Sequence, residues 1–153
     1  MSSAYSPSSS SLQAKPKVKL YAPARGAVAH PLTISGPVNP LAQTSHVSQH
    51  ITLPYVIEHI AVHFPPGSDH LVQAYLYLSF DPSSPTDALP TGLSLLSPFS
   101  ATPYLTGDSQ TIDLPMALRV SPRGTWLKLH LVNQDDAPHT ITSIWTLLEL
   151  LED

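Results

Sequence analysis

The sequence contains no cysteine and is poor in charge. The absence of cysteine excludes disulfide bonds and thiolate metal sites. Only 12% of the 153 residues are charged, whereas 42% are hydrophobic, and the surface of a freely soluble monomer usually carries more charge. We therefore expect Ser, Thr, Pro and His to cover much of the outside, or part of it to be buried against a partner. The length suits one domain with a sizeable core.

Long hydrophobic runs are also missing. The longest, IWTLLELL, is far shorter than the ~20 apolar residues that span a bilayer, and it contains Glu149. The first twenty residues, MSSAYSPSSSSLQAKPKVKL, lack the apolar segment of a secretory signal. We therefore expect a protein that is soluble when made, with no signal peptide and no membrane partner.

Glycine is scarce, with six residues, and neither a GxxxxGK[ST] nor a GxGxxG phosphate loop occurs. The GxSxG nucleophile elbow is absent as well. A Ser-His-Asp triad is defined by geometry, so the sequence leaves it open, but nothing points to one. We predict no enzyme activity, no catalytic residue and no cofactor.

Proline, in contrast, is abundant, with 17 residues. Residues 1–14 are rich in Ser, and five prolines between residues 16 and 40 disfavour helices because each removes a backbone donor. We therefore divide the chain into an extended, basic, Pro/Ser-rich N-terminal arm, residues 1–40, and a β-sandwich domain, residues 41–153. Within the arm, KVKLYA has the composition of an edge strand.

The few charges are unevenly distributed. The arm holds four of the seven basic residues, and residues 26–153 hold three basic residues against eleven acids, a net charge of -8. We expect the arm to dock on an acidic surface such as a neighbouring subunit, although a solvated tail is the simpler reading. Four charges are too few to predict nucleic-acid binding. The interface candidates on the arm are Lys15, Lys17, Lys19 and Arg25.

Apolar and polar residues alternate with a period of two in YVIEHIAVHF, LVQAYLYLSF, QTIDLPMALRV and TWLKLHLVN. Turn sequences such as PPGSD, SPRG and QDDAPH separate these segments. About seven or eight short strands in this pattern predict an all-β antiparallel sandwich that is jelly-roll-like. The last segment, WTLLELLED, also fits a helix, but its β-branched start favours a strand.

The apolar face of each predicted strand should form the core between the sheets. A charge at Leu76 or Leu129 should therefore prevent folding. The residues predicted to lie in this core are Val56, Ile60, Val62, Val72, Leu76, Leu78, Ile112, Leu114, Leu118, Leu127, Leu129 and Leu131.

Two histidine pairs have the four-residue spacing of a zinc-binding helix, namely His46 with His50 and His59 with His63. Both pairs lie in strand-like sequence, where four residues span about 13 Å, too far to share one ion. His59 and His63 also fall opposite the best apolar stripe. We therefore predict no metal site and treat His59 and His63 as interface candidates.

The aromatic residues allow a second interpretation. Trp126 is expected opposite the Leu face of its strand, so with nearby Tyr residues it could form a sugar-stacking platform. We count Trp126 among the interface candidates and keep a carbohydrate- or surface-binding module as an alternative function. A cupin-like metal-dependent enzyme, which needs several His and Glu converging inside a barrel, is a second alternative.

A sandwich with an extended arm resembles the small decoration, or cement, proteins of phage and virus capsids. The resemblance is one of plan, carried by the FPPGSDHLVQAYLYL and TWLKLHLVNQDDAPHTITSIW segments, both read as hairpins. It implies a non-catalytic protein that forms homo-oligomers, often trimers, and binds a capsid through its arm. It would then lie on the virion surface and stabilise the capsid.

Overall fold

The computed structural model describes residues 21–23, 29–98, 100–121 and 124–152, which form β-strands and turns. This part of the chain contains no helix of the length and apolarity needed to cross a membrane. Its strands are β1 (Tyr21–Pro23), β2 (His30–Val38), β3 (Gln43–Val47), β4 (Tyr55–Phe64), β5 (Val72–Ser79), β6 (Leu93–Ser94), β7 (Gln110–Val120), β8 (Trp126–Asn133) and β9 (His139–Glu152).

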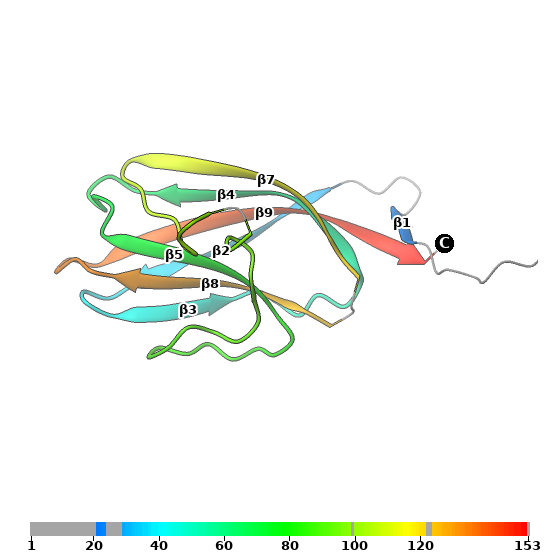
Figure 1. Cartoon of the computed structure of the whole chain (residues 1–153), viewed down its shortest axis with the longest axis horizontal. Helices are drawn as coiled ribbons and strands as arrows, with labels where there is room; N and C mark the ends of the chain where they lie inside the picture. Colours follow the sequence, from blue (N-terminus) through cyan, green and yellow to red (C-terminus); the bar gives the residue numbers. More distant parts are fainter. Residues whose placement is uncertain (1–20, 24–28, 99, 122–123, 153) are drawn as a thin grey trace, which may run out of the picture.

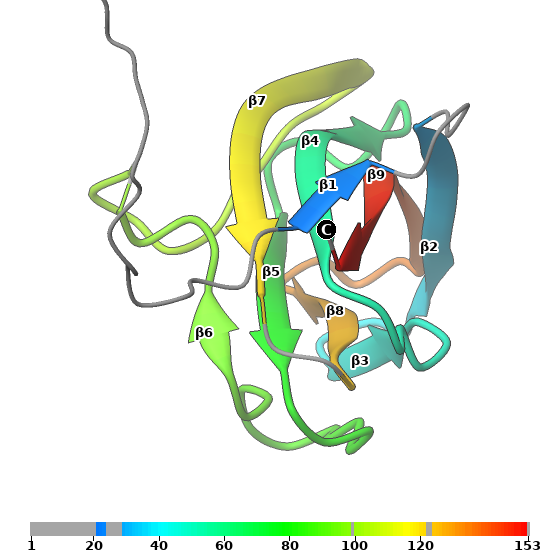
Figure 2. The same cartoon turned by 90° about the vertical axis from the view of Figure 1, so that its right-hand side faces the viewer.

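The strands form two antiparallel sheets packed face to face (Figures 1 and 2). The five-stranded sheet has the order β1-β9-β4-β7, with β2 also paired to β9, and the four-stranded sheet has the order β3-β8-β5-β6. The pairs β2–β9, β3–β8, β4–β7 and β5–β6 are nested, as in one long hairpin that has been rolled up. This nesting is the topology of a jelly roll, so the predicted fold class is confirmed.

The last segment is a strand throughout. β9 runs for 14 residues and pairs with β1, β2 and β4. Its even-numbered residues from Thr140 to Thr146 face outward, and the alternate residues Ile141, Ser143, Trp145 and Leu147 are buried. A period of two from Thr140 to Leu147 is that of a strand and not of a helix. The WTLLELLED segment continues this strand and pairs with β4 and β1.

The core lies between the sheets and follows the predicted stripes closely. Trp145 is its largest buried side chain, and its indole N–H donates to Ser143 Oγ at 2.8 Å. The predicted core residues on β7 are only partly buried, because β7 is the edge strand of its sheet. Those with less than a tenth of their surface exposed are Ile60, Val62, Val72, Leu76, Leu78, Leu127, Leu129 and Leu131.

Val56 was predicted in the core, and this prediction is wrong. The register of β4 shifts between Ile57 and His59 against both β7 and β9. An irregularity of this kind adds a residue and inverts the facing of the strand on one side of it. Tyr55 and Ile57 therefore point inward before the shift, Ile60 and Val62 point inward after it, and Val56 lies half-buried on the outer side.

The two segments read as hairpins do not form hairpins. β4 and β5 lie in different sheets, and so do β8 and β9. The turn at residues 65–71 and the turn at residues 134–138 therefore carry the chain from one sheet to the other. Gly67 adopts a φ of 94°, a conformation that glycine takes without steric strain.

The sandwich also includes residues that were assigned to the arm. All nine residues of β2, from His30 to Val38, pair with β9. The prolines in this strand are tolerated because β2 lies at the edge of its sheet. Tyr21 and Ala22, the end of the KVKLYA segment, pair with the end of β9, whereas Lys15 to Leu20 lie outside the described residues.

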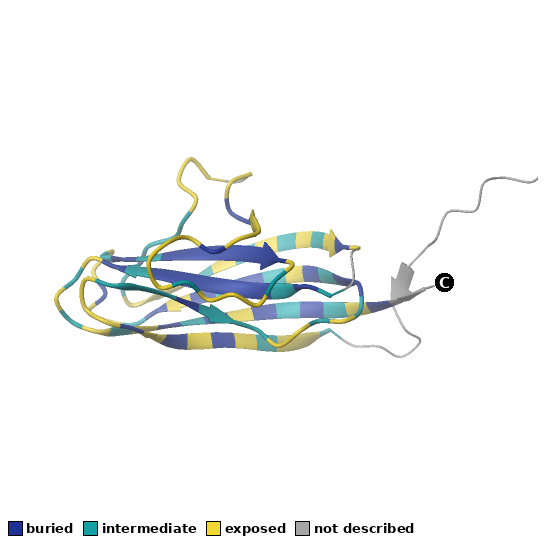
Figure 3. Ribbon diagram, turned by 90° about the horizontal axis from the view of Figure 1, so that it is seen from below, coloured by how far each residue is buried: buried dark blue, intermediate teal, exposed yellow. Residues whose placement is uncertain are grey.

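The two sheets differ in how their outer faces are covered. Figure 3 shows continuous dark blue, meaning buried, along the central strands of the four-stranded sheet, whereas strands of the other sheet are striped. In β5 and β8 both faces are largely buried, because residues 81–92 and 100–104, on the two sides of β6, lie over the outer face of this sheet. We call these residues the covering segment.

Candidate interaction surfaces

The outer face of the five-stranded sheet has no covering segment among the described residues. Its side chains are mostly hydroxyl-bearing or apolar, and Ile144 is 42% exposed at its centre. Because few charged groups would have to be desolvated, this face is suited to contact with another protein surface. Two cross-strand rows lie side by side on it: Thr33, Ile144, Ala61 and Asp113, and Ser35, Thr142, His63 and Thr111.

His59 and His63 lie on this outer face, opposite the buried Ile60 and Val62, as their spacing indicated. His63 Nδ1 lies 3.0 Å from Thr111 Oγ1, and His59 Nε2 lies 3.4 Å from Asp113 Oδ1. Both contacts join β4 to β7. The described residues contain no group of three or more His, Asp or Glu side chains placed to hold a metal ion. An interface role for the two histidines stays a prediction.

Trp126 is not part of this face. It opens β8 in the other sheet, and its ring stacks on His50 with centroids 4.2 Å apart and an interplanar angle of 15°. The remaining interface candidates, Lys15, Lys17, Lys19 and Arg25, lie outside the described residues. The fold therefore does not bring Trp126 together with His59 and His63.

The aromatic rings form no exposed row in the described part of the chain. Tyr55 and Trp145 are fully buried, and Tyr75 and Tyr77 are less than a tenth exposed. Tyr104, in the covering segment, packs on Tyr75 with ring centroids 5.4 Å apart. Most of these rings pack within the fold, so Trp126 lacks the neighbouring tyrosines that a sugar-stacking platform needs.

The covered outer face contains an ion pair between a buried lysine and a carboxylate that is 45% exposed. Lys128 projects outward from β8, yet its side chain is fully buried beneath the covering segment. Its Nζ donates to Asp81 Oδ1 at 3.1 Å and to Ser83 Oγ at 3.3 Å. Hydrogen bonds from Ser83 and Thr91, together with that from Lys128, hold the pKa of Asp81 well below its usual range. The pair fastens the covering segment to the sheet.

Beside this pair lies a buried Ser-His-Gln chain. Ser45 Oγ is 2.6 Å from His130 Nδ1, and His130 Nε2 is 2.8 Å from Gln43 Oε1. Because the Gln43 oxygen only accepts, the proton of His130 sits on Nε2 and Ser45 donates to Nδ1. Ser45 and His130 are both buried, so the hydroxyl is out of reach of a substrate. The arrangement cross-links β3 and β8 rather than preparing a nucleophile.

His130 should make stability depend on pH. Burial lowers its pKa from 6.5 to about 4. As pH falls through 6.5 the unfolded chain binds a proton that the folded chain does not, so stability is full above pH 6.5 and decreases towards pH 4. Denaturant unfolding of the wild type and His130→Gln between pH 7 and pH 4.5 measures this. We expect the wild type to lose more stability than the variant, and parallel losses would contradict the assignment.

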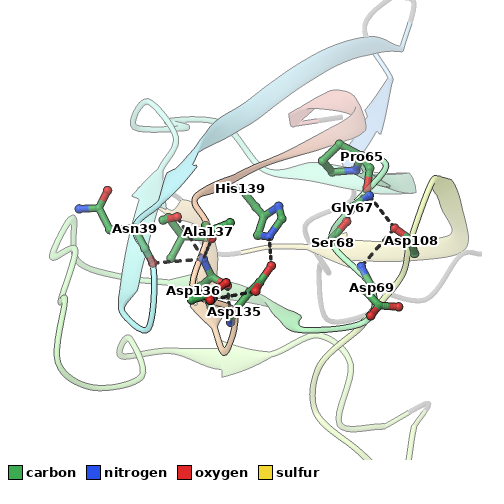
Figure 4. A network of polar contacts seen from close by, with 12 residues as sticks. Asn39, Pro65, Gly67, Ser68, Asp69, Asp108, Asp135, Asp136, Ala137 and His139 are labelled. Atoms are coloured by element: carbon green, nitrogen blue, oxygen red, sulfur yellow. Dashed lines mark hydrogen bonds and ion pairs between the residues drawn. The ribbon is translucent and has the colours of Figure 1, made fainter.

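Acidic residues gather in the turns at one end of the sandwich (Figure 4). Asp108 Oδ1 accepts from the backbone N–H groups of Gly67 at 2.9 Å and Asp69 at 3.1 Å. Asp135 Oδ2 lies 2.7 Å from His139 Nε2, and this hydrogen bond is the main cause that lowers the pKa of Asp135. These carboxylates serve local turns, as expected of Asp in such positions.

An apolar groove opens along the side of the sandwich where β7 and β6 end the two sheets. Its volume is about 490 Å³. Phe80 and Leu93 at its rim are 55% and 61% exposed. The groove exists because β7 has eleven residues, whereas β6 facing it has two. The described lining consists of Leu78, Phe80, Leu93, Ser94, Leu95, Pro98, Met116, Leu118, Arg119 and Val120.

Sequence reasoning missed the groove and the burial of Lys128 and His130. Alternation places Lys128 and His130 on the outward side of β8 correctly but carries no information on what covers that side. One signal was available, since about thirty residues separate β5 from β7 and contain almost no regular strand. A segment of that length in a compact domain has to pack on something.

Together, the strand order and the core define the class of this chain as a jelly-roll β-sandwich. No protein-family model matches the sequence, and no curated protein matches it. Among solved structures, it is similar to chains of infectious bursal disease virus, Gt strain and Gx strain. Identity is 12% to each, covering 88% and 86% of this chain but 30% and 31% of theirs, with TM-scores of 0.26 and 0.25. The chain thus spans about a third of their length.

Proposed function

We propose that this chain is a non-catalytic structural protein that associates with copies of itself and with a larger protein assembly. Its most specific form is a capsid-decorating or capsid-stabilising protein of a virion, which docks through its N-terminal arm. The observation that carries the proposal is the outer face of the five-stranded sheet, which is weakly charged and which no described segment covers. A face of this composition loses little hydration of charge when it is buried against protein.

The contrast between the two outer faces supports this choice. The covering segment buries even a lysine of the four-stranded sheet, whereas Ile144 at the centre of the other sheet is 42% exposed. The low charge of the whole chain fits the same interpretation. Surface charge keeps a protein in solution, and a surface that is buried against a partner does not need it. A partner that is itself weakly charged and flat would match this face.

Light scattering tests the proposal. We expect the full chain to have a mass that is a multiple of 16.5 kDa. Ile144→Lys should shift that mass towards the monomer, because a charge would have to be desolvated in the contact, weakening association by roughly tenfold or more. Leu41→Lys is the matched control, since Leu41 is 73% exposed in a turn away from this face. A wild-type chain that is monomeric would contradict the proposed self-association. An Ile144→Lys variant with the mass of the wild type would show that this face is not the contact surface.

Removal of the N-terminal arm gives a second test of the proposal. The structure indicates a cut before Tyr21 rather than before Leu41, because removing residues 1–40 would also delete β2. We expect the chain that starts at Tyr21 to fold and to associate less than the full chain. Equal association of both chains would mean that the arm takes no part.

A further inference from the structure

We propose that residues Pro16–Leu20 of the arm bind in the apolar groove between β7 and β6, with Val18 and Leu20 seated among its apolar side chains. This inference rests on the proposed function in that it names the site through which the arm acts. It does not require the chain to be an oligomer, because the arm of the same copy and that of a neighbour carry the same segment.

The groove is an incomplete part of the core. Met116, Leu118 and Val120 point inward from β7 but meet only a two-residue β6 on the other sheet. As a result Met116 and Leu118 are only partly buried, and Phe80 and Leu93 are more than half exposed at the rim. A volume of about 490 Å³ accommodates several aliphatic side chains of an extended segment.

The arm has the pattern that such a groove requires. Pro16, Val18 and Leu20 alternate with Lys15, Lys17 and Lys19. In an extended chain alternate side chains point to opposite sides, so the apolar residues can face the groove while the lysines remain in water. The lysines would then lie over a domain whose net charge is -8.

The arm also leaves the sandwich at the right end. Tyr21 pairs with Glu152 of β9. Val120, at the end of β7, pairs with Tyr55, and Tyr55 pairs with Glu149, only three residues from Glu152. Residues 16–20 directly precede Tyr21, and an extended chain spans about 3.3 Å per residue. The segment therefore extends up to about 16 Å from Tyr21, which is the width of about three neighbouring strands, and this length allows it to reach the groove of its own copy or that of an adjacent one.

Side-chain burial should contribute more to this contact than backbone pairing. β7 pairs with β4 along one edge, and no described strand pairs with its other edge. Pro115 and Ala117, which has a φ of 49°, interrupt the regular edge next to the groove. A strand that adds there finds few consecutive backbone partners, so Val18 and Leu20 carry the binding.

Limited trypsin digestion of the full chain measures the contact, because trypsin cuts after Lys17 and Lys19. Phe80→Ser combined with Leu93→Glu should raise the rate of cleavage at these two sites about tenfold or more. Both side chains are more than half exposed, so the variant should keep the thermal midpoint of the wild type, which serves as the check on folding. Leu41→Glu is the matched control and should leave the rate unchanged. Equal rates in all three proteins would overturn the inference.

Cross-linking identifies the copy that donates the arm. The chain has no cysteine, so Leu20→Cys with Leu93→Cys supplies the two reactive thiols for a short bismaleimide. A link within one chain or between two chains supports the groove as the site. In a mixture of chains that carry only Leu20→Cys with chains that carry only Leu93→Cys, a linked dimer shows that the arm binds the groove of a neighbouring copy. Leu20→Cys with Leu41→Cys should not link. If association depends on residues 1–20 yet no link to the groove forms, the inference fails and the proposed function stands. If the chain is monomeric and the link forms, the inference stands and the proposed self-association fails.

Discussion

Leu129→Asp is expected to abolish folding. Leu129 is fully buried at the centre of the core, directly opposite Leu76 in the register of β5 and β8. The substitution removes about 2–5 kcal/mol of apolar packing and adds a carboxylate without a partner, which together are comparable with the whole stability of a small domain. The variant should give no cooperative unfolding transition by circular dichroism.

Leu41→Asp provides the control for this experiment. Leu41 is 73% exposed and has a φ of 51°, a conformation that Asp tolerates. We expect its unfolding midpoint to match that of the wild type closely. A Leu129→Asp protein that unfolds cooperatively near the wild-type midpoint would show that the facing of β8 is wrong.

Asp81→Asn is expected to destabilise the protein strongly, and more than Lys128→Met does. The first change leaves the buried ammonium group of Lys128 without its carboxylate partner, whereas the second removes the charge and keeps a side chain of similar length. We expect Lys128→Met to alter the free energy of unfolding by less than about 1 kcal/mol or to increase it. Urea unfolding of the two variants gives the comparison.

The double variant completes the cycle. In the Lys128→Met background, Asp81→Asn should have little effect, because no buried charge remains to be paired. The hydrogen bonds that lower the pKa of Asp81 stabilise the folded protein. This contribution to the free energy of unfolding is present above the ordinary pKa of Asp and is lost as pH falls below that value. Equal effects of Asp81→Asn in both backgrounds would mean that the pair does not couple the covering segment to the sheet.

The strands were predictable because their signal is local. Alternation with a period of two places Leu127, Leu129 and Leu131 on one side of β8 whatever lies around them. The same signal assigned Val56 wrongly, because one irregularity in β4 inverts the facing. Its one mark in the sequence is Glu58, a charged residue that falls on the predicted apolar face. Hairpins were expected at residues 64–78 and 125–145, and this expectation was wrong. Turn residues show where the chain reverses but do not specify which sheet the next strand joins.

The candidate surfaces were harder to predict. The spacing of His59 and His63 gave their shared face, since both follow the strand period, but not their contacts with Asp113 and Thr111 on β7. The groove was invisible to sequence reasoning because it arises from the unequal lengths of β7 and β6, two strands in different sheets.

By itself, the sequence determined that this chain forms short alternating strands, that these strands form a sandwich, and which stripes make most of its core. Each of these follows from the period of the backbone and from the transfer of apolar side chains out of water. Only the tertiary structure decided that β2 belongs to the sheet, that Lys128 and His130 are buried, and that the described residues leave one side of the sandwich open. These features depend on segments far apart in the chain, such as Asp81 with Lys128 and Ser45 with His130, and local sequence carries no record of which segment will cover which face.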